Sequence, residues 1–193
     1  MTLFIVSLIL FLLTHSVRIV APDWRDAMIE RMGQQAWRGL YSVLSLATLV
    51  FLIYAFGASR TDAPLLYSPP AWMAHITLTL MLIAMILLMV SIFPAGKIAV
   101  WVKHPLLTAV KIWAFSHLLA NGEANSVLLF AGFLIWAVVA RISAKRQGID
   151  ARAFVSVKWD IAAVITGVVV YVAFVGFLHE YLIGVSPLAM AGM

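Results

Sequence analysis

Five histidines are the side chains of this sequence with the widest chemical use, because a neutral imidazole can enter an apolar region and ligate a metal ion. They are His15, His75, His104, His117 and His179, and the chain contains no cysteine. The lack of cysteine excludes disulfides, thiolate zinc sites, iron–sulfur clusters and thioether-linked haem. A metal or cofactor would therefore be held by imidazole, methionine, carboxylate or backbone atoms.

The composition indicates which elements must position these histidines. Hydrophobic residues make up 64% of the 193 residues and charged residues 11%, against roughly 45–50% and 25% in soluble domains. A soluble chain of this size could not bury so much apolar surface. We therefore predict an all-α integral membrane protein in which residues 1–193 form one transmembrane domain. This excludes a cytosolic enzyme, and we expect no nucleic-acid partner despite the net charge of +5.

Six apolar runs are candidates to cross ~30 Å of hydrocarbon, which takes about 20 helical residues. Their ranges are 2–20, 40–57, 72–93, 105–120, 125–140 and 159–183. The fourth and fifth are the shortest, and the turn residues Asn121–Ala124 between them predict a tight antiparallel hairpin. The sequence therefore predicts a polytopic bundle of six transmembrane helices, with the lipid bilayer as a partner.

Basic residues are concentrated in alternate loops of this six-span arrangement. Eleven of the thirteen lie in the first, third and fifth loops: Arg18, Arg25, Arg31, Arg38, Lys97, Lys103, Arg141, Lys145, Arg146, Arg152 and Lys158. The positive-inside rule places these loops in the cytoplasm and both termini on the non-cytoplasmic side. The first loop also mixes tryptophan and methionine with charged residues, which fits either a short interfacial helix or a solvated linker.

The histidines divide into two groups by their depth in the predicted spans. At ~1.5 Å per residue, His15 lies about 6 Å to the cytoplasmic side of its span's midpoint, and His104 lies at the cytoplasmic mouth of the fourth span. His117, His75 and His179 lie about 7, 10 and 12 Å to the outer side. Two intramembrane histidines on different helices can hold haem, and they can equally hydrogen-bond a neighbouring helix. For His15 and His117 both roles stay open, whereas His75 and His179 lie near span ends, where packing or interfacial hydrogen bonds are favoured.

Lys111 is a basic residue near the middle of the fourth predicted span, away from the span ends. It lies seven residues after His104 and shares its helix face. A lysine near the bilayer midplane either reaches to the cytoplasmic surface, pairs with a carboxylate, or meets an anion such as a cofactor carboxylate. The sequence leaves these alternatives open.

Several stretches of the chain resemble the NnrU family of bacterial membrane proteins. The segment from Lys103 to Gly122 reads KHPLLTAVKIWAFSHLLANG, the segment from Leu128 reads LLFAGFLIWA, and the segment from Trp37 reads WRGLYS. With His15-Ser16 they cover nearly the whole chain in order. One departure is Lys103, where the family usually has arginine before His-Pro. The resemblance implies a multi-pass protein of the bacterial inner membrane that is linked to nitrogen-oxide metabolism in denitrification.

The related plant zeta-carotene cis–trans isomerases add a cofactor to this expectation. The resemblance to them implies haem b with His15 and His117 as its ligands and His104 as a further matched histidine. Lys111 is a further cofactor-binding candidate because of its place near the bilayer midplane, where it could meet an anion. His15 and His117 differ by about 13 Å in depth, so the better-levelled pair of His75 and His117 is an alternative. We expect a haem protein that serves nitrogen-oxide metabolism or isomerises an apolar small molecule by a redox switch. The alternative is a membrane scaffold or assembly factor without a cofactor.

Overall fold

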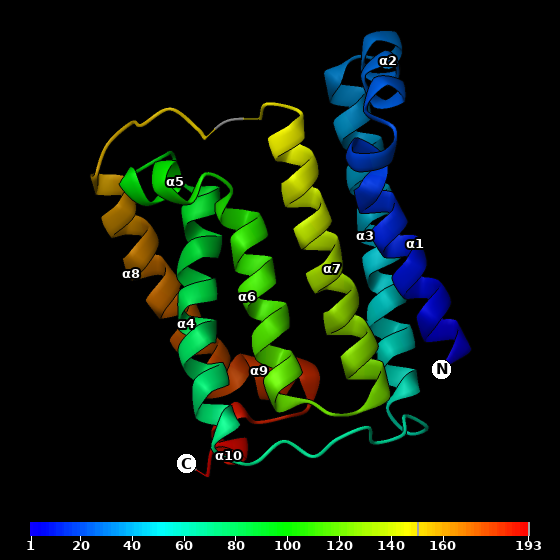
Figure 1. Ribbon diagram of the computed structural model, residues 1–193, viewed down its shortest axis with the longest axis vertical. Coiled ribbons are helices and arrows are strands. Elements are labelled where there is room, and N and C mark those ends of the chain that lie inside the picture. Colours follow the sequence, from blue (N-terminus) through cyan, green and yellow to red (C-terminus); the bar gives the residue numbers. More distant parts are fainter. Residues whose placement is uncertain (150, 193) are drawn as a thin grey trace.

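The computed structural model describes residues 1–149 and 151–192, and within them the named elements are all helices (Figure 1). The long helices are α1 (Thr2–Val20), α3 (Gln34–Ser59), α4 (Met73–Ile92), α6 (Pro105–Ala120), α7 (Ala124–Arg146) and α8 (Lys158–Ala173). The short elements are α2 (Pro22–Met32), α5 (Lys97–Val102), the π-helix η1 (Phe174–Leu178), α9 (His179–Ile183) and α10 (Pro187–Met190). The all-α class predicted from the composition is confirmed.

Five of the described helical segments are long and apolar enough to cross a membrane. They are α1, α3, α4, α7 and the continuous segment Lys158–Ile183 formed by α8, η1 and α9. In each, only 11–22% of the most apolar window is buried inside the protein, so most of its side chains are available to lipid. The helix α6 is apolar but has 16 residues, so the sixth crossing stays a prediction.

Two spans are longer than the apolar runs that predict them. The run 40–57 lies within α3, which begins at Gln34, and the run 125–140 lies within α7, which ends at Arg146. Polar and basic residues at these ends continue the helix beyond the apolar stretch, because long basic side chains can extend toward water while their stems stay on the helix. The predicted hairpin is confirmed, since α6 and α7 pack against each other on either side of the short turn after Ala120.

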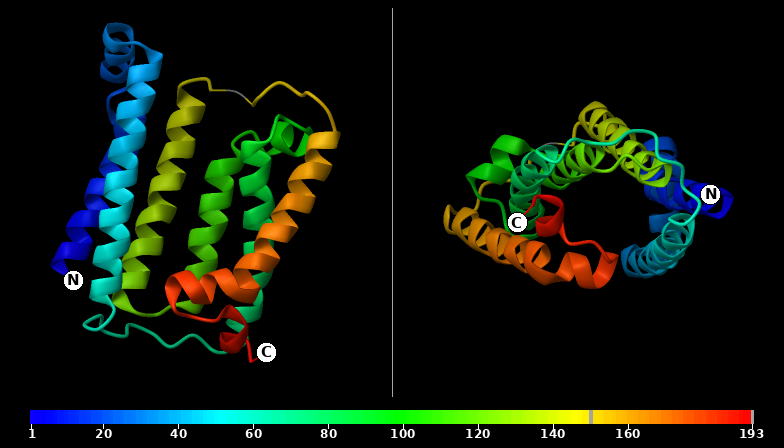
Figure 2. Two further views of the ribbon diagram at one scale, coloured as in Figure 1. Left: turned by 180° about the vertical axis from the view of Figure 1, so that it is seen from behind. Right: turned by 90° about the horizontal axis from the view of Figure 1, so that it is seen from below.

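The long helices pack in the order α8, α4, α6, α7, α1 and α3, which differs from their order in the chain. Figure 2 shows them around an elongated outline when viewed along the bundle, with α1 and α3 at one end of it and α8 and α4 at the other. The guanidinium of Arg60, just after α3, donates a hydrogen bond to the carbonyl oxygen of Ile183 at the end of α9, at 2.7 Å. This bond joins the two ends of the helix series.

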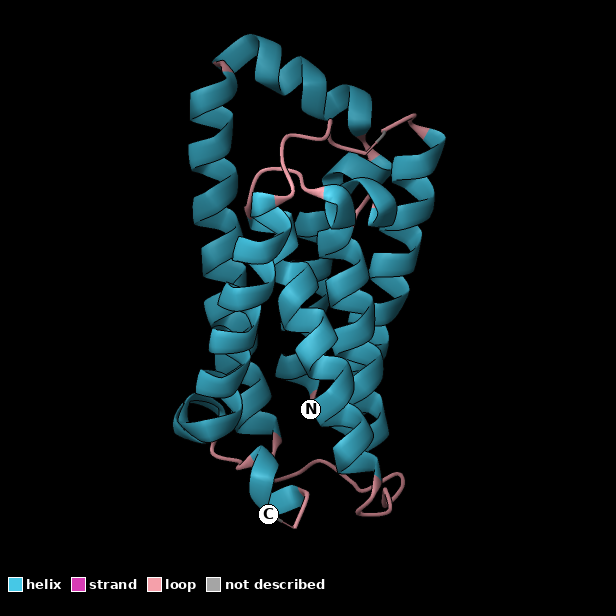
Figure 3. Ribbon diagram, turned by 90° about the vertical axis from the view of Figure 1, so that its left-hand side faces the viewer, coloured by secondary structure: helices cyan, strands magenta, loops and turns pink. Residues whose placement is uncertain are grey.

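The loops gather at the two ends of the bundle (Figure 3). The loops after α1, α4 and α7, which carry the concentrated basic residues, lie at one end, and both termini lie at the other (Figure 1). The first loop contains a helix, α2, which lies across its end of the bundle, so the helical alternative for this loop is confirmed.

Side-chain contacts to backbone groups hold the basic end together. Arg152 donates to the carbonyl oxygens of Phe93 and Val90 at the end of α4, at 2.9 and 2.6 Å. The carboxylate of Asp160 in α8 accepts the amides of Lys97 and Ile98 at 2.7 and 3.1 Å. These contacts satisfy backbone groups that helix ends leave without intrahelical partners.

Thiol labelling on intact cells tests the predicted orientation, because the native chain has no cysteine. Thr61 and Gln147 are exposed and lie after α3 and α7, at opposite ends of the bundle. We expect an impermeant reagent to label Thr61→Cys in intact cells and Gln147→Cys only after lysis. Labelling of Gln147→Cys alone in intact cells would show the opposite orientation.

Candidate functional site

His117 lies near the end of α6, in a segment fixed from several sides. Pro105 occupies the first turn of this helix, where proline suits the backbone. At the other end, the phenol of Tyr67 donates to the carbonyl oxygens of Leu118 and Asn121, the latter at 2.8 Å. Burial, and then the negative charge of Glu123, raise the pKa of Tyr67, so the neutral, donating phenol is favoured. The last turn of α6 is therefore well defined.

The structure brings the rings of His117 and His179 together. Their centroids are 6.5 Å apart and their planes differ by 24°. The Nδ1 atom of His117 donates to the carbonyl oxygen of Trp113 at 2.9 Å, and Nδ1 of His179 donates to that of Val185 at 2.8 Å. Because a carbonyl only accepts, each Nδ1 carries the proton and each neutral ring keeps a lone pair on Nε2.

A π-helix directly precedes His179. The segment Phe174–Leu178 widens the last span by i→i+5 hydrogen bonds before the helix resumes as α9. The hydrogen bond from Arg60 to Ile183 then holds the end of α9 against the end of α3. Such π-helical turns occur frequently at functional sites, and this one sets the position from which His179 meets His117.

The pair has the chemistry of a metal-binding site with two imidazole ligands. Metal-binding histidines usually donate their second ring nitrogen to a carbonyl or carboxylate, which fixes the tautomer. The two ring centroids are 6.5 Å apart, and each ring would offer its Nε2 lone pair to an ion. Within the described residues, no group of three or more histidine, aspartate or glutamate side chains could hold a metal. The two imidazoles, each with its tautomer fixed, are therefore the metal-ligating side chains that the structure brings together here.

The sequence favoured packing or interfacial hydrogen bonds for His179, because it lies near the end of a span. The structure gives its Nδ1 a hydrogen bond to the carbonyl oxygen of Val185 and also places its ring centroid 6.5 Å from that of His117. The sequence did carry one signal, because the depth estimate places both residues toward the same side of the bilayer. What it could not show is the π-helix, which changes the direction in which His179 projects from its span.

His15 lies in a different part of the bundle and does not reach His117. Its Nδ1 donates to the carbonyl oxygen of Phe11 at 2.8 Å, and its Nε2 accepts from the hydroxyl of Ser45 in α3 at 3.0 Å. The rings of Phe11, Phe133 and Trp113 link the two histidines through successive centroid distances of 4.1, 5.4, 5.2 and 5.6 Å. The structure therefore places three aromatic rings between the two ligands that the family resemblance implies.

The remaining histidine candidates lie away from the pair. His75 is exposed at the start of α4. The ring that His117 meets is that of His179, and the structure shows no contact between the rings of His75 and His117, the alternative pair. His104 precedes α6 and lines a cavity of about 250 Å³ with Lys103 and Arg152. Lys103 has a φ of 65°, and the amide of His104 donates to the carbonyl oxygen of Val102 at 2.8 Å. This is a tight, strained three-residue turn.

Lys111 has no carboxylate partner among the residues that the structure describes. The neighbouring helix α7 brings a second cation, Arg141, into its surroundings, and the Arg141 guanidinium donates to the carbonyl oxygen of Val102 at 3.1 Å. Pairing with a carboxylate, one of the three alternatives, therefore has no support in the described residues. The remaining alternatives are a side chain that reaches toward the basic end and one that meets an anion.

Comparison with known proteins gives one family. The family model described as NnrU protein matches residues 3–187. No curated protein and no solved structure gives a significant match.

The substitution Lys111→Met tests the two remaining roles of this lysine. A lysine at the centre of a membrane helix costs about 2.5–3.5 kcal/mol on insertion scales, and Arg141 adds like-charge repulsion. We expect Lys111→Met to raise the melting temperature in detergent, whereas Lys111→Arg, which keeps the charge, leaves it unchanged. A lower melting temperature together with reduced occupancy of a copurified ligand would assign Lys111 to an anion instead.

Proposed function

The chain belongs to the NnrU family, and on this basis we propose that it is a haem-binding protein of the bacterial inner membrane. The observation that carries the proposal is the pairing of His117 with His179, with ring centroids 6.5 Å apart. The residues that hold the group in this proposal are His117 from α6 and His179 from α9. His15, the other ligand implied by the family resemblance, lies beyond three aromatic rings from this pair.

The surroundings of the pair suit a large apolar group. The ring of Phe130 lies 4.6 Å from that of His117, and the indole of Trp113 lies 5.6 Å from it. These aromatic side chains keep water from one side of the imidazole, and the carbonyls of Trp113 and Val185 hold both rings in one tautomer. A haem held there by His117 and His179 would supply one-electron chemistry.

For the reaction that such a haem serves, we propose nitrogen-oxide metabolism or the redox-switched isomerisation of an apolar small molecule. Both follow from the family resemblance rather than from a substrate site. The proposal includes six membrane crossings, with α6 as the short one, and the basic loops in the cytoplasm. In this arrangement the histidine pair lies toward the outer side, at the end of the bundle opposite the basic loops.

A scaffold or assembly factor without a cofactor is the second candidate. The hydrogen bonds of His15 support this candidate, because they give that residue a structural role. Both ring nitrogens of His15 are used within the α1–α3 pair, one by the backbone of Phe11 and one by Ser45. This is the pattern expected of a histidine that fastens two helices. The rings of His117 and His179 differ, because no described residue hydrogen-bonds either Nε2.

Haem content of purified variants tests the proposal. We expect wild-type protein from haem-replete cells to show a Soret band near one haem per chain. His117→Ala and His179→Ala should each lose at least about nine-tenths of it, since each removes one of the two imidazoles that would hold the group. His75→Ala is the matched control because this ring is exposed and lies outside the pair, and it should keep the full haem content.

The histidine at position 15 separates the two ligand assignments. His15→Ala should keep the haem if His117 and His179 are the ligands. Loss of haem in His15→Ala with full content in His179→Ala would return the assignment to His15 and His117. A colourless wild-type protein from haem-replete cells would leave the scaffold as the function.

A further inference from the structure

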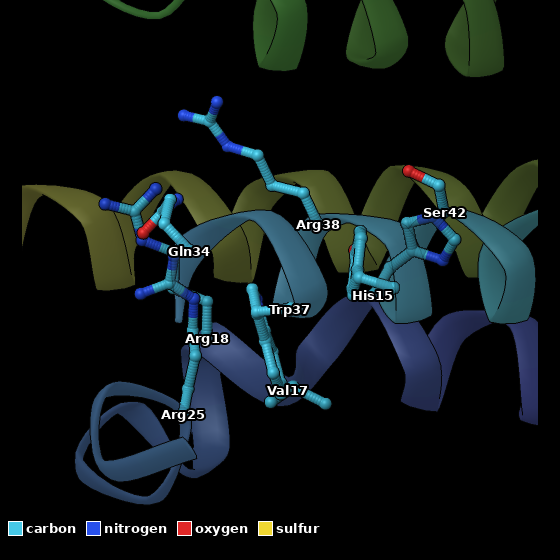
Figure 4. A pocket seen from close by; sticks show the side chains of 9 residues that line it. His15, Val17, Arg18, Arg25, Gln34, Trp37, Arg38 and Ser42 are labelled. Atoms are coloured by element: carbon cyan, nitrogen blue, oxygen red, sulfur yellow. The ribbon is translucent and has the colours of Figure 1, made fainter. Parts of the chain in front are cut away.

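A cavity of about 500 Å³ lies between the end of α1, the helix α2 and the start of α3. It lies at the end of the bundle that carries the basic loops. In Figure 4, Arg18 and Arg25 gather at one end of the cavity, His15 lies at the other, and Trp37 lies between them. The cavity therefore joins a cationic region to an aromatic one.

Three arginines supply the charge of this cavity, and two of them lack an anionic partner. Arg25 pairs with the carboxylate of Asp26 at 2.6 Å. The guanidinium groups of Arg18 and Arg38 form no ion pair or hydrogen bond with any residue in 1–149 or 151–192. Like charges around one space repel each other, and an anion between them turns this repulsion into attraction.

An aromatic wall continues the cavity away from the arginines. Trp37 is buried, and its ring lies 6.4 Å from that of Tyr41 with planes 24° apart. Trp24 of α2 meets Trp37 edge-on at 5.9 Å, and Tyr41 meets His15 at 5.8 Å. A ligand that fills the cavity would thus combine an anionic group with an apolar part.

The level of the cavity in the bundle indicates which anions are available to it. Arg18 lies in the last turn of α1, and Arg38 lies near the start of α3. In the orientation predicted by the positive-inside rule, this is the level of the cytoplasmic headgroups, where anionic phospholipids are concentrated. Arginine binds phosphate oxygens through its planar fork of donors, and two arginines suit a group with several acceptor oxygens.

We propose that this cavity is a phosphate-binding site, with Arg18 and Arg38 as direct ligands and the apolar part of the ligand against Trp37 and Tyr41. The phosphate belongs either to an anionic phospholipid or to a soluble phosphate ester. The site is separate from the histidine pair and does not depend on bound haem.

Native mass spectrometry and thermal melts of the full chain in detergent test this site. The variant Arg18→Gln/Arg38→Gln removes both ligands, and Arg31→Gln/Arg146→Gln is the matched control. The control lowers the charge at the same end of the bundle equally, at exposed residues outside the cavity. Without added ligand, the first variant should melt no lower than wild type, because it loses only repelling charges.

The probes are phosphatidylglycerol, zwitterionic phosphatidylcholine and glycerol 3-phosphate. We expect wild type and the control to bind phosphatidylglycerol and to melt higher with it, and we expect Arg18→Gln/Arg38→Gln to bind it at least about tenfold more weakly. Binding of glycerol 3-phosphate as strong as that of the lipid would identify a soluble ester as the source.

Equal binding of phosphatidylglycerol by wild type and Arg18→Gln/Arg38→Gln would overturn the proposal. Loss of haem from this variant with unchanged lipid binding would also overturn it, because the arginines would then hold carboxylates of the cofactor.

Discussion

A polar group inside a bilayer has no water to bond with, so it must find its partner within the protein. This constraint explains how the helices of this chain carry so many hydroxyls. In α1, the hydroxyls of Ser7, Thr14 and Ser16 donate hydrogen bonds to carbonyl oxygens three or four residues earlier, at 2.7–2.8 Å. The histidines follow the same rule, since His15 and His117 each bond the carbonyl four residues before them. What distinguishes one imidazole from another is therefore the second ring nitrogen, which Ser45 occupies in one case and no described side chain occupies in the other.

The fold class and most of the spans could be predicted because they depend on composition and on the length of apolar runs. The turn at Asn121–Ala124 was readable for the same reason, since turn residues interrupt an otherwise apolar sequence. Which helices pack against each other could not be predicted from the sequence. Packing of α4 between α6 and α8, and of α1 between α7 and α3, depends on which small residues let backbones approach. Gly167 shows this directly, because a Cβ there would come within 2.7 Å of the backbone of Ile86 in α4.

The candidate site was only half predictable. His117 stands in a recognisable sequence context, whereas His179 depends on a local change of helix type that hydropathy does not register. Residue depth could be counted from the sequence, but the direction of a side chain could not. The same limit applies to the basic cavity, because charge segregation identifies the end of the bundle at which Arg18 and Arg38 lie. The sequence does not show that α2 lies across that end. This placement of α2 encloses the cavity that Arg18, Arg38 and Trp37 line together.

The π-helix at Phe174–Leu178 has a consequence for how relatives of this chain are compared. A π-helical turn contains one residue more than the α-helical turn that it replaces, so it corresponds to a single inserted residue. Deleting one residue there would restore the regular helix and leave the residues after it, including His179, facing as before. A chain with the same number of residues but no π-helical turn would instead have His179 rotated by about 100°. The two-histidine arrangement is thus compatible with a one-residue gap in an alignment of this segment, whereas an ungapped relative needs the same π-helical turn to keep it.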